Sequence, residues 1–584
     1  MSNSSKTPNF DAKIKAILAG TKPGERVCEL TGEKWMMDER EIEWYRRFGA
    51  PPSQFSPRTR MIQVGAFRTM FEIFWNKHSK TGEPTLSYIH PDIPVPIVLD
   101  EEWHALEIGD MPEYQMSVDV NKSFFDQFEQ LVRKIPMGAR REWRNIKNTV
   151  GVGMWDVEDS YMVFSTVGAK RCMYTYYCLE GSEDITQSIF VLTSQNCFGC
   201  AQISRCHSCR AAFESSDCIN CSFIYDCRNC EFVFGGANLR YKKFVWFNEQ
   251  LTEEEWCKRF AQVNLGCRSQ FNQHQTSFRQ LVEQSASPEN FNTNAQESTG
   301  EYLTDCVRCR DCYYLQRGTD CWFAQSSRDS EGCAFVSAAY PAHQSWMSSM
   351  LNECHNTKYS HTSSRSTGLE YCVNCHDCED CFGCNGLRKK KFHIFNKLYS
   401  EDAYWQTVDA LKCAMLDRGE YGQFLPLSLS PTGLQFSQVD AFYDLLEKDV
   451  VRFGSPLYDA DRGIAFAPQK TLTAPLADLT QVPDCISEVQ SDWAQKPFLD
   501  PDVHRRWSVP PQELAYLKRS GLPFPQSHYS TRLRDLYLTM NRPEAEQKHC
   551  ASCQKLISVG RNKTFPNRRV YCSSCYLKYL NVQH

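Results

Sequence analysis

The chain has 584 residues, of which 65 are basic and 70 acidic, so its formal net charge is −5. Apolar residues make up 42% and charged residues 23%, a balance that excludes a disordered chain and predicts several globular units. No apolar run approaches the ~20 residues of a membrane span, and the first residues lack the apolar stretch of a signal peptide. We therefore expect neither membrane association nor secretion, and the near-neutral charge argues against nucleic-acid binding over the whole surface.

A gapless shift of 472 positions aligns the two ends of the chain. It places Trp35 on Trp507, Glu41 on Glu513, Arg47 on Arg519, Gly49 on Gly521 and Thr59 on Thr531. Both copies read as a helix that ends at Gly and is followed by Pro. After an N-terminal extension (1–27), this predicts a small α+β module at 28–110 and a related helix and module at 501–584.

Cysteine is the outlier of the composition, with 30 residues, and 23 of these lie between positions 172 and 384. Residues 196–209, NCFGCAQISRCHSC, align with 217–230, DCINCSFIYDCRNC, at a period of 21, which returns at Cys312, Cys333, Cys354 and Cys375. Such a period without helical patterning predicts a mainly β chain, a β-solenoid with 21-residue coils stacked at ~4.8 Å. Asp or Asn often precedes Cys, and both tolerate the left-handed conformation of a tight corner. We interpret each pair as a corner residue followed by an inward thiol.

A second repeat doubles the solenoid. Residues 239–248, LRYKKFVWFN, align with 387–396, LRKKKFHIFN, at a shift of 148, and each segment leads into a helix start, at Thr252 and at Ser400. We therefore predict two solenoid units, each closed by a strand and a capping helix. The predicted order after the first module is a basic helical linker (111–155), the first solenoid (156–283), a linker (284–300), the second solenoid (301–423) and an extended connector (424–500).

The strongest chemical signal lies in the C-terminal module. Cys550, Cys553, Cys572 and Cys575 form two CxxC pairs at the spacing that a tetrahedral zinc ion requires. Four thiolates leave no open position, so we predict a structural zinc ribbon, with iron–sulfur ligation as the main metal alternative. The shift of 472 replaces these four cysteines with His78, Thr81, Asp100 and Trp103. The N-terminal module is therefore predicted to be a degenerate ribbon without metal, in which Cys28 is a lone buried thiol.

The solenoid cysteines allow two interpretations. In 21-residue coils, Cys197 and Cys200 would lie over Cys218 and Cys221, and Cys206 and Cys209 over Cys227 and Cys230, which would create two four-thiolate zinc sites. Alternatively, the thiols form a ladder of small apolar side chains that fills a narrow core. The five cysteines from Cys372 to Cys384 do not divide into fours and favour the ladder.

Two further functions can be weighed on the residues. The C-terminal ribbon is basic, and Lys563, Arg568 and Arg569 are candidate contacts to nucleic acid or a ribonucleoprotein. Solenoids also host carbohydrate-cleaving enzymes, but the aspartates before the cysteines are explained by corner geometry. They are Asp305, Asp311, Asp320, Asp377 and Asp380. No nucleotide, hydrolase or metalloprotease motif is present, and we expect no enzyme.

The segments SFIYDCRNC, NLRYKKFVWFN, PLSLSP, PPQELAYLKRSGLPFP and CASCQ…RRVYCSSCYLKYL carry a resemblance over nearly the whole chain. The chain resembles a group of uncharacterised cysteine-rich proteins from candidate-phyla (Patescibacteria) bacteria and giant viruses. The resemblance implies a zinc-ribbon and cysteine-repeat architecture, without an activity to carry over. Relatives usually carry more intact CxxC pairs than this chain does.

Together these patterns predict a non-enzymatic zinc-binding scaffold or assembly protein of a reducing compartment, in the cytoplasm or in a virus particle. Its flat solenoid faces would bind a protein partner, and an uncovered sheet edge would allow self-association. The first alternative is nucleic-acid or ribonucleoprotein binding through the basic ribbon. The second is a carbohydrate-active solenoid enzyme.

Overall fold

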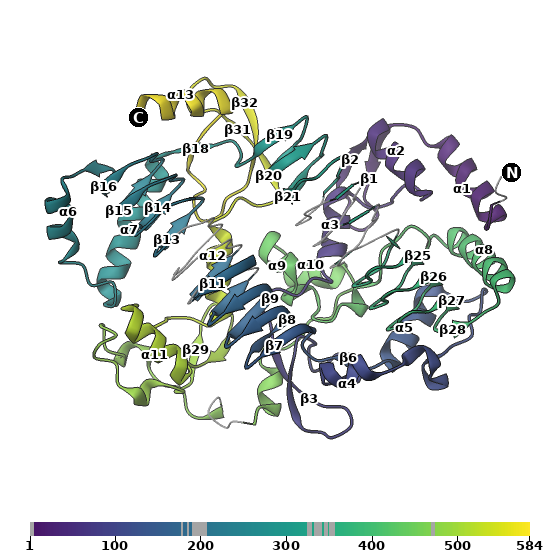
Figure 1. Cartoon of the computed structure of the whole chain (residues 1–584). Helices are drawn as coiled ribbons and strands as arrows, with labels where there is room; N and C mark the ends of the chain where they lie inside the picture. The colour runs from purple at the N-terminus through teal and green to yellow at the C-terminus, as the bar shows by residue number, and fades with distance from the viewer. Residues whose placement is uncertain are drawn as a thin grey trace.

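Two β-solenoids occupy the centre of the computed structural model, and helices and small hairpin modules surround them (Figure 1). The structure describes residues 5–176, 179–183, 186–189, 207–323, 330–331, 342–343, 349, 357–468 and 473–583. The prediction of a mainly β chain with two solenoid units is confirmed.

The first solenoid is built from parallel strands that lie on successive coils. Its strands are β7 (Glu142–Lys147), β8 (Val150–Glu158), β9 (Tyr161–Lys170), β10 (Met173–Tyr176), β11 (Leu179–Glu183), β12 (Thr186–Ile189), β13 (Arg210–Phe213), β14 (Ser222–Tyr225), β15 (Glu231–Ala237) and β16 (Lys243–Trp246). In its last coils Arg210 pairs with Ser222, and Ser222 pairs with Phe234. The Cys227 amide likewise donates to the Ser215 hydroxyl, which lies 12 residues earlier in the chain. That separation is the length of one coil there, and the predicted coil length of 21 is wrong.

A left-handed residue at every third position explains the 12-residue coil. Positive φ angles recur at 208, 211, 214, 217, 220 and so on to 247. Each left-handed residue turns the chain at a corner, and the residue after it points inward. Four sides of three residues therefore make one coil. Cys209, Cys218 and Cys221 follow such corners and are fully buried. The interpretation of Asp-Cys and Asn-Cys pairs is thus confirmed at Asp217 and Asn220. The period of 21 is a multiple of three, so it kept the inward phase while missing the length of the coil.

The second solenoid repeats this construction. Its strands are β19 (Thr293–Gln296), β20 (Gly300–Val307), β21 (Cys312–Gln316), β22 (Ser330–Glu331), β23 (Ala342–His343), β24 (Thr357–Lys358), β25 (Thr367–Glu370), β26 (Glu379–Phe382) and β27 (Lys391–Ile394). Thr367 pairs with Glu379, which pairs with Lys391, so the coil has the same length as in the first unit. The five aspartates predicted as corners all have φ between 47° and 55°.

Each solenoid ends in the same way. The short strands β17 (Glu249–Gln250) and β28 (Lys397–Leu398) turn back antiparallel to β16 and β27, and so cover the edge of the last coil. Helices α6 (Glu253–Phe260) and α7 (Arg268–Gln284) follow the first unit, and α8 (Glu401–Asp417) follows the second. The predicted capping box of Thr252 and Glu255 is present, and Ser400 caps α8.

The first solenoid begins earlier than predicted. The expected linker at 111–155 contains α5 (Phe124–Lys134) and β6 (Met137–Gly138), but β7 and most of β8 already belong to the coils. Left-handed residues at Asn145 and Asn148, three positions apart, occur there without cysteines, and so the cysteine spacing could not reveal these coils.

The two solenoids lie side by side and run in opposite directions. Trp143, at the start of the first, packs its ring 5.4 Å from the ring of His376, near the end of the second. At the other end Glu214 of the first accepts a hydrogen bond of 2.6 Å from Tyr302 of the second. Figure 1 shows this arrangement, with β7–β9 next to the end of the second unit and β13–β15 next to the start of it.

The modules at the two ends of the chain share one fold. The N-terminal module contains β1 (Gly24–Val27), β2 (Lys34–Met37), α2 (Glu39–Phe48), α3 (Pro57–Gly65), β3 (Phe74–Lys77), β4 (Pro84–Ser87), β5 (Ile97–Val98) and α4 (Asp100–Ala105). The C-terminal module contains β29 (Phe498–Asp500), β30 (Arg505–Trp507), α11 (Pro511–Ser520), α12 (Tyr529–Leu538), β31 (Ala545–His549), β32 (Leu556–Gly560), β33 (Arg569–Tyr571) and α13 (Ser573–Gln583). Both helix-ending glycines, Gly49 and Gly521, are left-handed as predicted.

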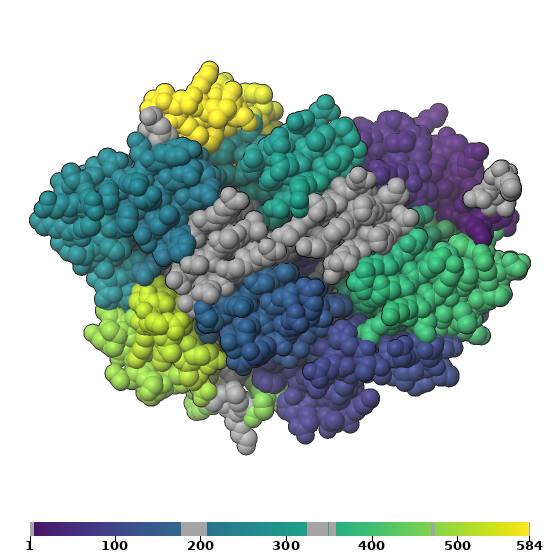
Figure 2. Space-filling model, viewed as in Figure 1, coloured from purple at the N-terminus to yellow at the C-terminus, as the bar shows by residue number. Residues whose placement is uncertain are grey.

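Hairpin registers show that the two modules correspond residue by residue. Phe74 pairs with Ser87 in the N-terminal module, and Glu546 pairs with Val559 in the C-terminal module, so both partners differ by 472. The connector that precedes the C-terminal module carries α9 (Gln438–Phe442) and α10 (Glu447–Arg452). Helix α1 (Pro8–Gly20) lies outside the repeat and packs on α8. In Figure 2 the C-terminal residues cover the junction between the two solenoids.

Candidate metal centre

The four cysteines of the C-terminal ribbon (residues 545–583) converge on one point. Cys550 and Cys553 lie in the turn between β31 and β32, while Cys572 and Cys575 lie at the start of α13. Their four sulfur atoms all lie within 4.8 Å of one another. The predicted ligands are thus brought together, and the site could hold a metal ion. Four soft sulfur donors suit zinc or iron and would fill a tetrahedral shell.

Backbone hydrogen bonds shape the turn before any metal binds. The Cys550 amide donates to the Lys555 carbonyl at 2.9 Å, and the Gln554 amide donates to the Cys550 carbonyl at 3.0 Å. Gln554 is left-handed, with φ of 61°, which closes the turn. Across the site the Cys572 amide points at the Cys550 sulfur from 3.3 Å. Amides that point at sulfur stabilise a thiolate, which is the form that binds a metal.

The pKa values of the ribbon thiols follow from these contacts. Burial raises the pKa of Cys550, but amides of Cys553 and Cys572 outweigh it and bring the pKa down to about 6. The Ser574 hydroxyl lowers the pKa of Cys572. The Lys555 amide lowers the pKa of Cys553, yet the neighbouring thiols raise it to about 11. Thiolates at such short range repel one another, and a cation at their centre removes that repulsion.

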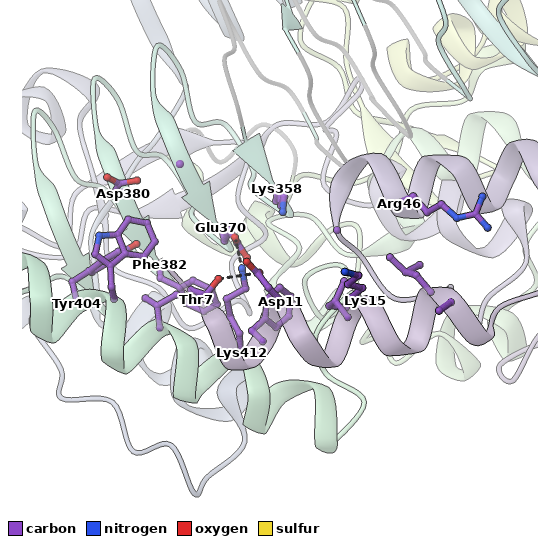
Figure 3. Close-up of a pocket in the computed structure, with 18 residues that line it drawn as sticks. Thr7, Asp11, Lys15, Arg46, Lys358, Glu370, Asp380, Phe382, Tyr404 and Lys412 are labelled. Atoms are coloured by element: carbon purple, nitrogen blue, oxygen red, sulfur yellow. Dashed lines mark hydrogen bonds and ion pairs between the residues drawn. The ribbon is translucent and has the colours of Figure 1, made fainter. Parts of the chain in front are cut away.

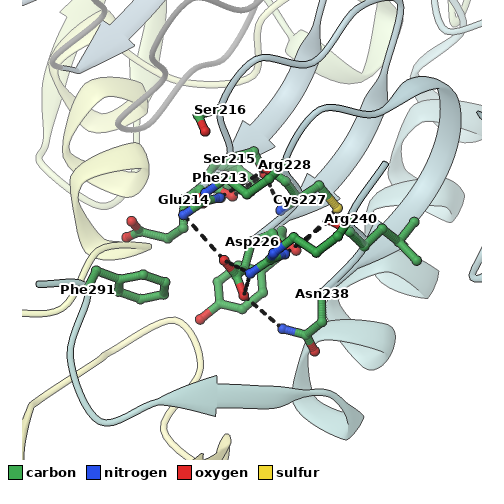
Figure 4. A network of polar contacts seen from close by, with 12 residues as sticks. Phe213, Glu214, Ser215, Ser216, Asp226, Cys227, Arg228, Asn238, Arg240 and Phe291 are labelled. Carbon is green, nitrogen blue, oxygen red and sulfur yellow. Dashed lines mark hydrogen bonds and ion pairs between the residues drawn. The ribbon is translucent and has the colours of Figure 1, made fainter. Parts of the chain in front are cut away.

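The ribbon is anchored to both solenoids. Strand β33 adds in parallel to β18 (Ala286–Pro288), which joins the two units. Helix α13 contributes Tyr576, whose hydroxyl donates to the buried carboxylate of Asp226. Figure 4 shows how Asp226 also receives Arg240, at 3.1 Å to each oxygen, and Asn238, at 3.1 Å. The metal centre thus lies next to the place where the first solenoid ends and the second begins.

The N-terminal counterpart of the ribbon contains no metal-binding group of this kind. Thr81 donates its amide to His78 Nδ1 at 3.2 Å, and the other ring nitrogen lies 3.2 Å from Glu102. Asp100 accepts the Arg140 amide at 2.8 Å. Within the described ranges, four-cysteine convergence is found in the C-terminal ribbon alone. His78 therefore links the hairpin to α4 through Glu102, whereas Asp100 binds the backbone at Arg140 instead of the hairpin.

Sequence reasoning missed a second pair of related turns. Each module has a further hairpin, β1–β2 or β29–β30, that faces the start of α3 or α12. In the N-terminal copy Cys28 lies 3.3 Å from the Thr59 hydroxyl, and Ser56 caps the helix. Asp500, which is 472 positions after Cys28, accepts from the Thr531 hydroxyl at 2.8 Å. Cys28 and Thr31 are three positions apart, and so are Ser56 and Thr59, as are the cysteines of a CxxC pair. The sequence shows this signal once Ser and Thr are allowed at the cysteine positions.

The described solenoid cysteines line the core. Cys209, Cys218, Cys221, Cys227 and Cys230 are all fully buried, with valine, isoleucine and leucine among their neighbours. Cys209 lies over Cys221, and Cys218 over Cys230, because this is the register of adjacent coils. The predicted stacking, which assumed the period of 21, is therefore wrong. Cys197, Cys200 and Cys206 lie outside the described residues. The described thiols Cys209 to Cys230 donate to backbone carbonyls, as Cys218 does to Ser216 at 3.3 Å, an arrangement that suits the ladder.

One disulfide differs from the expectation of free thiols. Cys267, before α7, is bonded to Cys485 of the connector, and the two residues form an antiparallel bridge. With Asp484 they make the other described group of potential metal ligands, but bonded sulfurs are not thiolates. The pairing joins segments 218 residues apart, and no local spacing could predict it.

The candidate nucleic-acid residues are largely engaged within the chain. Lys563 forms an ion pair with Asp444. Arg568 is 4% exposed and donates to the Gly560 carbonyl at 2.7 Å. Arg569 stays at the surface and donates to the Tyr571 hydroxyl at 3.0 Å. Arg568 is thus buried, whereas Lys563 and Arg569 lie at the surface, Lys563 with its charge paired.

The corner aspartates are held by neighbouring coils. Arg308 binds Asp320 through two hydrogen bonds of 2.7 and 2.8 Å, and Arg365 binds Asp377 in the same way at 2.7 and 2.9 Å. Each arginine lies one coil length before its aspartate, so the pairs connect successive coils. A structural role accounts for these carboxylates.

Comparison with family models, with curated proteins and with solved structures finds no match for this chain. Among the described helices, none has the length and apolar character needed to cross a membrane. The residues and their geometry are therefore the basis of the functional proposal.

Proposed function

We propose that the protein is a non-enzymatic scaffold that binds one structural zinc ion and takes part in assembling a larger complex, in a cell or in a virus particle. The convergence of the four ribbon sulfurs within 4.8 Å carries this proposal. Such a shell leaves no position for a water molecule or a substrate, as in structural rather than catalytic zinc sites.

The position of the site supports a structural role. The ribbon contacts β18 through β33 and Asp226 through Tyr576, so a metal there would hold the junction of the two solenoids. We propose zinc because four thiolates from two CxxC turns are the ligand set of structural zinc ribbons, and metal analysis distinguishes zinc from iron. When bound, zinc would cross-link the hairpin and α13 while the chain's own residues make the contacts to the solenoids.

The solenoids support the scaffold part of the proposal. Two antiparallel units with 12-residue coils provide long faces, and β17 and β28 cover their last edges. Such faces serve repeat proteins as binding surfaces. Covered edges would direct binding to the faces rather than to strand addition.

Metal content tests the zinc site. The full chain, purified under reducing conditions without chelator, is expected to contain about one zinc per chain by plasma mass spectrometry. Cys572→Ser should lose the zinc, whereas Cys257→Ser, which changes an exposed cysteine of α6, should keep it. Three or more zinc ions, or iron in place of zinc, would contradict the single structural site.

Sedimentation tests the scaffold role. In a lysate of its native source the chain is expected to migrate in an assembly larger than its own 67.5 kDa. The assembly should dissolve when zinc is removed and should survive nuclease treatment. Migration as a monomer would contradict the proposal, and loss of the assembly after nuclease would favour the nucleic-acid alternative.

A further inference from the structure

A cavity of about 670 Å³ lies at the end of the second solenoid. Helices α1 and α8 form its walls, and strands β24–β26 form its floor (Figure 3). Its volume is within the range of small-molecule pockets in proteins. The metal centre lies in another part of the molecule, so the cavity is independent of the proposed scaffold role.

Most of the cavity lining is apolar. Phe10, Ile14 and Leu18 follow one face of α1, where the helix spacing of three to four residues aligns them. Val408 of α8 and Phe382 of β26 lie across from them. The buried carboxylate of Asp409 holds the start of α1 through the Phe10 amide at 2.8 Å, which fixes this wall.

Three lysines line the cavity, and the two less exposed ones, Lys412 and Lys358, differ in their partners. Lys412 pairs with Glu370 at 2.9 Å, and the Tyr421 hydroxyl donates to the other oxygen of Glu370 at 2.7 Å. Both carboxylate oxygens of Glu370 therefore have a hydrogen-bond donor. The ammonium of Lys358, on the adjacent strand β24, forms no hydrogen bond and no ion pair within the described part of the chain. Burial lowers the pKa of Lys358, a cost that a bound anion would offset.

The equivalent place on the first solenoid is filled. The shift of 148 relates Lys358 to Arg210, and both lie at the same register, since Lys358 pairs with Glu370 and Arg210 with Ser222. Arg210 donates to the Ser520 carbonyl at 3.2 Å. Phe278 and His274 of α7 pack on Phe223 and Phe234 there. In the second unit α1 takes the place of α7, and the cavity there stays open. Within the described residues, the Lys358 ammonium has no carbonyl partner like the one that Arg210 has.

We propose that this cavity binds a small amphipathic carboxylate, with its anionic group at Lys358 and its apolar body between α1 and α8. An unpaired ammonium at the floor of an apolar pocket recognises a carboxylate, and the apolar walls exclude water from the pair. A ligand of this class satisfies both features, whereas with a neutral ligand Lys358 and Lys412 would share the single carboxylate of Glu370.

The other charges at the cavity do not reverse this preference. Arg46 is paired with Glu39. Asp11 accepts hydrogen bonds from the Thr7 and Ser5 hydroxyls. Lys15 adds an exposed positive charge to the lining. Asp380 is a half-buried carboxyl, and burial raises its pKa to about 6.

A fluorescent fatty acid tests the site. Dansyl-undecanoate is expected to bind the full chain with one equivalent per chain and to be displaced by dodecanoate. Dodecanol and dodecyltrimethylammonium, which have the same tail with a neutral or a cationic head, should displace it at least tenfold less well. Equal displacement by all three would overturn the proposal, as would the absence of probe binding.

Substitutions locate the ligand. Lys358→Met should weaken binding of the probe at least tenfold, whereas Lys389→Met, at an exposed lysine of the same solenoid, should leave it unchanged. Ala19→Trp, at an exposed position of the rim, should also weaken binding and does not disturb the core. If Lys358→Met does not fold, Ala19→Trp carries the test. Unchanged binding in a folded Lys358→Met protein or in Ala19→Trp would overturn the proposal.

Discussion

Tyr302 of the second solenoid donates a hydrogen bond of 2.6 Å to Glu214 of the first. Both side chains are buried where the two units meet. Burial raises the pKa of Glu214 to about 8, although the bond from Tyr302 lowers it. Burial likewise raises the pKa of the nearby Glu301 to about 7. At neutral pH Glu214 is therefore mostly protonated, and Glu301 is about half protonated.

This contact predicts that stability falls as pH rises. Glu214 binds its proton more tightly in the folded chain than in the unfolded chain, where its pKa is near 4.5. The free energy of unfolding should therefore decrease between about pH 4.5 and pH 8, by up to ~1.4 kcal/mol for each unit. Glu214→Gln should flatten this slope and be more stable than the parent at pH 8.5. Thermal midpoints at pH 5.5 and 8.5 measure the effect, and Glu283→Gln, an exposed change on α7, should keep the parent slope. Equal slopes for Glu214→Gln and the parent would contradict the assignment.

A buried ion pair in each module predicts strong destabilisation when one partner is removed. Glu41 and Arg60 lie 2.9 Å apart and are each 1% exposed. Arg60→Met should destabilise the chain by about 3–5 kcal/mol, since Glu41 would remain charged and buried. The double variant Glu41→Gln/Arg60→Met should recover part of this loss in urea unfolding. Arg46→Met, which removes an exposed pair, should cost below ~1 kcal/mol. A double variant less stable than Arg60→Met would refute the explanation.

The cysteine ladder predicts that serine is tolerated at inward positions. Cys375 donates to the Val373 carbonyl at 3.4 Å, and Ser363, one coil earlier, donates to the His361 carbonyl at 3.3 Å. Cys375→Ser should therefore change stability by about 1 kcal/mol or less, whereas Cys375→Leu should cost ~1–3 kcal/mol by overpacking. Thermal midpoints and zinc content would be measured together. A loss of zinc in Cys375→Ser would restore the interpretation of the solenoid thiols as metal ligands.

The anchor of the ribbon predicts a local effect of Tyr576→Phe. Removing the hydroxyl takes one donor from the buried Asp226, at a cost of about 1–3 kcal/mol. Hydrogen exchange should speed up in α13 and β18, as it should after chelation, while zinc content stays at one per chain. Tyr241→Phe, at an exposed tyrosine of the first solenoid, serves as the matched control. Unchanged exchange in α13 would show that the ribbon is held by other contacts.

The corner and inward positions of this fold can be predicted from the sequence, but the number of residues in one coil cannot. Asp217 before Cys218 identifies a corner and an inward thiol because Asp tolerates φ of 54° and a thiol suits a narrow core. The number of corners in one coil depends on the angle by which each corner turns the backbone. Any coil length that is a multiple of three would place the same residues inward, so the inward pattern does not give the coil length. The antiparallel contact of Trp143 with His376 joins distant parts of the sequence, which no repeat relates.

The metal centre was predictable for the same local reason. The spacing of Cys550, Cys553, Cys572 and Cys575 predicts a four-thiolate site by itself. The equivalence of Cys28 and Asp500 is clear only in the structure, where Thr59 and Thr531 contact them. The cavity beside Lys358 depends on α1, which has no counterpart in the repeats. The sequence therefore predicts a site that a motif encodes. It does not predict a cavity that forms where one copy of a repeat differs from the other in its covering helices.

The contacts at the two ends of the solenoid pair, Trp143 with His376 and Glu214 with Tyr302, require the two units to match in length. The interval from Trp143 to Glu214 and the interval from Tyr302 to His376 are both close to six 12-residue coils. Adding one coil to a single unit would move one contact by the ~4.8 Å spacing of strands and break it. Insertions in such a chain would have to occur in both units together, so the pair can lengthen during evolution only in matched steps.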